Sequence, residues 1–111
     1  MLNLCHEMRK LGFLIGVDEP DYQAFIISLN DSIFYVVEGC YHSKRKEMLY
    51  SFSKNYYHKK EGKTQVSKLY FNKLPMEMMI KRVASFVSFM IEKNFFKPLD
   101  RNILIYAKEI R

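Results

Sequence analysis

The sequence of 111 residues has few of the features that usually assign a compartment. It contains two cysteines, and its longest apolar run, Val83–Ile91, spans nine residues, whereas a membrane helix needs about 18 or more. Three charged residues within the first ten interrupt any signal-peptide core. We therefore expect a cytoplasmic protein with no membrane segment. In that compartment Cys5 and Cys40 are expected to be free thiols rather than a disulfide.

Motifs that fix a reaction are also missing. Cys5 and His6 are adjacent, so their side chains diverge, and a single Cys-x-His at Cys40 and His42 lacks the second ligand pair of a structural zinc site. A Cys40 nucleophile would also need an orienting group and an oxyanion site, and the sequence identifies neither. We therefore expect no metal, no cofactor and no catalytic residue, and predict that the protein is not an enzyme.

One enzymatic alternative stays open. Small basic proteins can cleave RNA without a metal, using histidine, lysine and tyrosine as acid, base and charge stabiliser. His42 and His58, with tyrosines and lysines beside them, are the right residue types. Their spacing does not indicate convergence, so a metal-independent ribonuclease is the less favoured hypothesis.

Length and composition predict one folded domain, covering residues 1–111. A mass of 13.3 kDa is typical of a single domain, and 49% hydrophobic residues can form a core. We find no repeat, linker or low-complexity run.

The first half of the chain predicts a short helix and a hairpin. Apolar residues at helical spacing indicate a helix over 3–11, ended by Gly12, and a connection over 12–21. Strands over 22–29 and 32–38 would be joined by a two-residue turn at Asn30-Asp31, which pairs Phe25 with Val36. Both faces of this hairpin are apolar. We therefore expect it to be covered on both sides, or on one side with the other at an interface.

The second half predicts two more strands and a long helix. The strands are expected over 48–53 and 64–71, joined by a basic, tyrosine-bearing loop over 54–63. The helix over 75–95 has Pro75 in its first turn and is mostly buried, with one polar stripe. The members of that stripe are Glu77, Lys81, Ser85, Ser88 and Glu92. Residues 103–107 form a final strand or short helix. Strands and helices are segregated, which predicts an α+β fold with a mainly antiparallel sheet of about four to five strands.

The net charge of +6 is concentrated in the middle of the chain. Residues 1–40 carry two basic and six acidic residues, whereas residues 41–82 carry eleven basic and three acidic residues. A basic segment favours an anionic partner. Thirteen of the eighteen basic residues are lysine, which lacks the planar geometry that arginine uses to recognise bases and phosphates.

Seventeen aromatic residues and seven methionines are a large apolar supply for such a small domain, and both types are common at protein contacts. With no catalytic constellation, the sequence favours a protein-binding function, most concretely an inhibitor or immunity protein that occludes a toxin or enzyme. The alternative is nucleic-acid binding through the basic segment 41–73. A homodimer contact through the long helix also stays open. For either partner, the candidate binding residues are Lys44, Arg45, Tyr56, Tyr57, Lys59 and Lys60.

Overall fold

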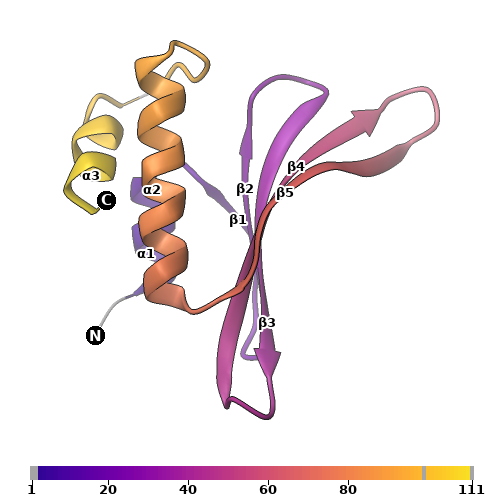
Figure 1. The fold of residues 1–111 in the computed structure, drawn as a ribbon. Helices are drawn as coiled ribbons and strands as arrows, with labels where there is room; N and C mark the ends of the chain where they lie inside the picture. The colour runs from indigo at the N-terminus through magenta and orange to yellow at the C-terminus, as the bar shows by residue number, and fades with distance from the viewer. Residues whose placement is uncertain (1–2, 99, 111) are drawn as a thin grey trace.

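The computed structural model describes residues 3–98 and 100–110, which form one sheet and three helices (Figure 1). The elements follow the chain in the order α1 (Leu4–Lys10), β1 (Leu14–Asp18), β2 (Tyr22–Ser28), β3 (Ile33–His42), β4 (Glu47–His58), β5 (Lys63–Leu74), α2 (Met76–Glu92) and α3 (Asn102–Ile110). The five strands are antiparallel and lie side by side in chain order. The helices lie on one side of the sheet (Figure 1). The predicted α+β class with an antiparallel sheet is confirmed.

Helix α1 begins and ends where its sequence predicts. The side chain of Asn3 accepts a hydrogen bond from the backbone nitrogen of His6, which satisfies one of the free donors at the start of the helix. Gly12 follows the helix with a φ of 95°, a conformation that residues with a Cβ rarely adopt.

The prediction of a connection over 12–21 is wrong, because Leu14–Asp18 form strand β1. This strand pairs with β2 at the edge of the sheet and is irregular between Ile15 and Val17. Strand β1, with its apolar residues, extends the sheet by pairing with the edge of β2 that β3 leaves free. The alternation of inward-facing and outward-facing residues is too weak to be recognised in the sequence, because the strand has five residues with Gly16 at its centre.

The central hairpin is present, but its predicted register is wrong by one residue. Phe25 lies opposite Val37, not Val36. The side-chain oxygen of Asn30 accepts hydrogen bonds from the backbone nitrogens of Ser32 and Ile33, both at 2.8 Å, so the turn is wider than the predicted two residues. A shift of one residue exchanges the two faces of a strand. Phe25 therefore shares the buried face with Tyr35 and Val37.

The predicted loop over 54–63 is largely strand. Strand β4 continues to His58 and β5 begins at Lys63, so only residues 59–62 form the turn. Tyrosines and alternating polar residues extend the two strands well beyond the predicted core segments. The pairing of β4 with β5 is irregular at three places between Tyr50 and Asn55. These irregularities let the hairpin bend. Figure 1 shows its far end leaning away from the helices.

Helix α2 is confirmed, and the final element is helix α3 rather than a strand. Ser88 does not belong to an exposed polar stripe, because it is fully buried on the core side of α2. Its position one helical turn from Ala84 places it toward the core, and serine is small enough to pack there. No described helix is long and apolar enough to cross a membrane.

The core lies between the helices and one face of the sheet. Along each strand, side chains point alternately into this core and toward the opposite face. The residues that point into the core include Phe25, Tyr35, Val37, Tyr50 and Phe52. The intervening residues of β2 and β3 lie on the opposite face, which no helix covers in the part of the chain that the structure describes (Figure 1). The central hairpin is therefore covered on one side. We call the other side the open face.

Candidate macromolecule-binding surface

The six residues predicted to bind a partner lie at two ends of the same strand. Lys44 and Arg45 are in the turn before β4, whereas the other four are at or beyond its last residues. At about 3.3 Å per residue, an extended strand of this length separates the two ends by roughly 35 Å. The structure therefore divides the basic segment into two separate surfaces.

The turn between β3 and β4 has limited freedom to bind a partner. The guanidinium of Arg45 lies 3.1 Å from the carboxylate of Glu47. The backbone nitrogen of Arg45 donates a hydrogen bond to Nδ1 of His42, at 3.3 Å. Lys44 is exposed beside them. Glu47 therefore offsets part of the positive charge that this turn offers.

The opposite end of β4 carries the remaining four residues on different sides. Tyr56 and Tyr57 are consecutive in a strand, so their side chains point to opposite faces. In the turn, the ammonium of Lys59 lies 3.5 Å from the carboxylate of Asp31, and Lys60 is exposed. The far end of the β4–β5 hairpin thus has two faces of different character.

The face on the helix side of this hairpin is basic and aromatic. The strand pairing places Lys54 opposite Lys68 and puts Tyr56 and Lys63 farther along the same side. The ammonium of Lys68 lies 5.0 Å from the centre of the Tyr70 ring, a cation–π arrangement. We call these five residues the Lys–Tyr strip. Lys54 is absent from the predicted set. Lys54 is two residues from Tyr56, and this spacing places the two side chains on one face only when the segment is a strand.

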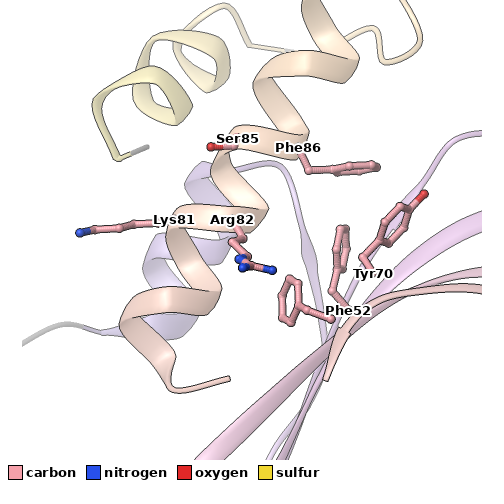
Figure 2. Close-up of a pocket in the computed structure, with 7 residues that line it drawn as sticks. Phe52, Tyr70, Lys81, Arg82, Ser85 and Phe86 are labelled. Carbon is pink, nitrogen blue, oxygen red and sulfur yellow. The ribbon is translucent and has the colours of Figure 1, made fainter. Parts of the chain in front are cut away.

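The strip leads to a small aromatic pocket of about 340 Å³ beside α2. Figure 2 shows Phe86 reaching from the helix toward Tyr70 on the sheet, and the two ring centres are 5.4 Å apart. Arg82 extends toward these rings, while Lys81 points away from them (Figure 2). A guanidinium beside aromatic rings suits a flat or anionic group. Arg82 also lies outside the predicted set, because it is far from the hairpin in sequence.

The open-face side of the same hairpin carries exposed apolar side chains next to polar ones. Val66 lies opposite Asn55, and Leu69 lies opposite Ser53. Val66 and Leu69 are 59% and 55% exposed, although both are aliphatic. Tyr57 is on the same side and is also exposed. These three residues, which we call the apolar strip, face solvent, and no helix in the described part of the chain lies over them.

A polar network joins α1 to the sheet at the other end of the molecule. The hydroxyl of Tyr50 donates to Oε1 of Gln23 at 2.6 Å, and Nε2 of Gln23 donates to Asp18 at 2.9 Å. The Asp18 carboxylate also interacts with the Cys5 thiol. Hydrogen bonds from Gln23 and Cys5 lower the pKa of Asp18, whereas burial raises the pKa of Tyr50 to about 12. The network uses neutral Tyr50 and ionised Asp18.

Neither cysteine is suited to nucleophilic attack. Both are free thiols, and they lie on opposite faces of the sheet. Burial raises the pKa of Cys5, and so does the neighbouring Asp18. Burial and then Glu38 raise the pKa of Cys40. The thiolate is the reactive form of cysteine, so these raised pKa values disfavour reaction at either thiol.

The histidines of the ribonuclease hypothesis do not converge. His42 ends β3 at one end of the sheet, while His58 ends β4 at the other. His58 instead contacts the side chain of Gln65 at 3.1 Å. Within residues 3–98 and 100–110, no group of three or more His, Cys, Asp or Glu side chains could hold a metal ion.

Comparison with protein-family models, with curated proteins and with solved structures found no match for this chain.

Proposed function

We propose that this protein is a non-enzymatic binding protein whose β4–β5 hairpin docks onto another protein. The observation that carries the proposal is the apolar strip on a hairpin that leans away from the helices (Figure 1). Exposing Val66 and Leu69 to water is unfavourable by roughly 25 cal/mol for each Å² of apolar surface. A partner that covers them removes that exposure.

The charge on the hairpin favours an acidic partner. Residues 54–68 contain five lysines and one acidic residue, Glu61. One of these lysines, Lys59, is paired with Asp31. The others extend around the turn and along the Lys–Tyr strip. Complementary charge mainly speeds association, whereas buried apolar contacts slow dissociation. The two sides of the hairpin would thus have separate roles in binding.

The most concrete form of this function is inhibition or immunity by occlusion. A hairpin only two strands wide can enter a cleft that a whole domain cannot. The remaining body of the molecule would then block the entrance to that cleft. This mechanism needs a preformed surface and no catalytic residue.

Affinity purification from cells that express the chain tests the proposal with matched variants. The double variant Val66→Ser/Leu69→Ser removes the apolar strip. Its control, Met78→Ser/Ile105→Ser, removes two side chains of similar exposure from the helices. We expect one discrete protein to be retained stoichiometrically by the native chain and the control, and to be lost by the first variant. Equal retention by both variants would contradict the proposal.

Nucleic-acid binding is a second candidate, favoured by the Lys–Tyr strip. Lysines on either side of Tyr56 and Tyr70 can neutralise phosphates while the rings stack on bases of a single strand. This function predicts that a single-stranded RNA oligonucleotide binds with an affinity that falls steeply with salt. Lys54→Gln/Lys68→Gln would weaken that binding, and Val66→Ser/Leu69→Ser would not. Absence of RNA binding at low salt excludes this candidate without affecting the first.

A further inference from the structure

A second feature of the molecule is an apolar cleft of about 1160 Å³ at the end of the core. It lies between strands β1 and β2 on one side and the last turns of α2, with residues 95–98, on the other. Ile27 and Leu29 line it from the sheet, while Val87 and Ile91 line it from the helix. Small-molecule sites are typically clefts of about 300 to 1,000 Å³ with mostly apolar walls. At about 1160 Å³, this cleft is somewhat larger than that range.

The cleft exists because α2 packs closely against only part of the sheet. Its inward side chains meet the aromatic residues of β4 and β5, where Phe86 and Phe52 have ring centres 5.0 Å apart. Above β1 and β2, the walls combine partly buried aliphatic side chains, such as Ile15, Ile27 and Ile91, with phenylalanine rings. The phenylalanines are Phe13, Phe95 and Phe96.

The charged residues that line the cleft have one sign. They are Arg9, from the last turn of α1, and Lys97, from the segment after α2. Neither is within ion-pair distance of a carboxylate in the part of the chain that the structure describes. No acidic residue lines the cleft. Two unpaired cations at an apolar cleft complement a ligand with an anionic head and an apolar chain.

We propose that this cleft binds an aliphatic carboxylate, the chemical class of a medium-chain fatty acid. The chain would lie among Ile27, Leu29 and Ile91, and the carboxylate would meet Arg9 and Lys97. Carboxylates pair well with guanidinium and ammonium groups because charge-assisted hydrogen bonds are stronger than neutral ones. The site is separate from the hairpin, so it does not depend on the proposed protein partner.

The absence of tryptophan from the chain allows a direct binding assay. Phe95 lines the cleft and is 56% exposed, so Phe95→Trp places a single fluorescent reporter there. Phe89→Trp is the matched control, because Phe89 is 51% exposed on α2 and does not line the cleft. Decanoate, below its micelle-forming concentration, should change the emission of the first variant saturably and leave the second unchanged. No saturable change, or the same change in both, would overturn the proposal.

Chain length and head group test the two parts of the site separately. Each added methylene from octanoate to dodecanoate should tighten binding by up to about fourfold, as burial of a methylene predicts. In the Phe95→Trp background, Arg9→Gln/Lys97→Gln should weaken decanoate binding about tenfold. The same change should leave the affinity for 1-decanol unaltered. Urea unfolding establishes that the variants fold. Equal losses for decanoate and decanol, or no loss for either, would contradict the assignment of the two cations.

Discussion

At the scale of single residues, the tightest constraint is the packing of Tyr50 on Gly39. The two residues lie opposite each other in β3 and β4 on the core side of the sheet. A Cβ on Gly39 would lie 2.4 Å from a ring carbon of Tyr50, closer than real atoms approach. Tyr50 is held in place by its hydrogen bond to Gln23. The glycine therefore creates the space for the ring, and the ring completes the network that reaches Asp18.

Gly39→Ala is accordingly expected to destabilise the protein by about 1–3 kcal/mol, the range for overpacking a well-filled core. The measurement is the free energy of unfolding from urea titration. Ser51→Ala, which changes the neighbouring strand on the open face, is the control and should shift this free energy by less than about 0.5 kcal/mol. A Gly39→Ala protein as stable as the native one would show that Tyr50 moves freely.

Tyr50 also gives a prediction about alkaline pH. Burial raises its pKa to about 12, whereas a phenol in an unfolded chain ionises near pH 10. The unfolded state therefore loses its proton first. The stabilisation from neutral Tyr50 is complete below about pH 10 and is lost as the pH rises toward about 12.

Tyr50→Phe removes this dependence. Near neutral pH the variant should be about 1 kcal/mol less stable than the native protein, because it lacks the hydrogen bond to Gln23. That difference should shrink between about pH 10 and about pH 12. Urea unfolding at several pH values measures it. A difference that stays constant over this interval would mean that Tyr50 ionises normally in the folded protein.

At the scale of elements, the turn after β2 decides which side chains enter the core. The sequence predicts the strands on both sides of it, because their β-branched and aromatic residues are dense. It does not predict the register, because both faces of the hairpin are apolar and either register buries a similar set. The Asn30 side chain, with its two hydrogen bonds at 2.8 Å, widens the turn and places Val37 rather than Val36 opposite Phe25.

Asn30→Ala is expected to lower the free energy of unfolding by about 1–2 kcal/mol, because two backbone donors lose their acceptor. Asn30→Asp keeps an acceptor oxygen in the same position and should retain most of the stability. Urea titration of both variants measures the effect. If the alanine variant matches the aspartate variant, the side chain does not set the turn.

The β4–β5 hairpin is the element that the sequence predicts least well. Lysines and polar residues over 54–63 suggest a loop, yet all but residues 59–62 belong to two paired strands. The candidate residues Tyr56 and Tyr57 are therefore on opposite faces, a separation that only a strand produces. Lys54 and Arg82 are missed for a related reason: strand pairing and helix packing bring them to this surface, not proximity in sequence.

The exposed turn of this hairpin should be cleaved by trypsin before helix α2. Limited trypsin digestion is expected to cut after Lys59 or Lys60 before any lysine of α2, because residues 59–62 are exposed and lie outside both strands. Mass spectrometry of the first fragments identifies the site. Initial cleavage after Lys81 instead would show that α2 opens more readily than the hairpin turn. Protection of the turn by a bound partner would locate the contact.

At the scale of the whole molecule, the three helices of the described residues lie on one side of a five-stranded sheet, and none of them covers the other side (Figure 1). The sequence predicts this class from its segregated helices and strands, and it also predicts two apolar faces on the central hairpin. It leaves undecided whether the second face is covered. Whether the second face is covered depends on where α3 packs. Helix α3 packs against α1 and α2, on the same side of the sheet as they are. The open face and the projecting hairpin are therefore the surfaces available to a partner.

The most direct test of a protein-binding hairpin is the dissociation rate of the co-purified partner from two double variants. We predict that Val66→Ser/Leu69→Ser raises this rate at least tenfold. Lys54→Gln/Lys68→Gln should leave it nearly unchanged and instead slow association, with a weaker dependence on salt. The opposite result, with dissociation governed by the lysines and indifferent to the apolar strip, would contradict the account.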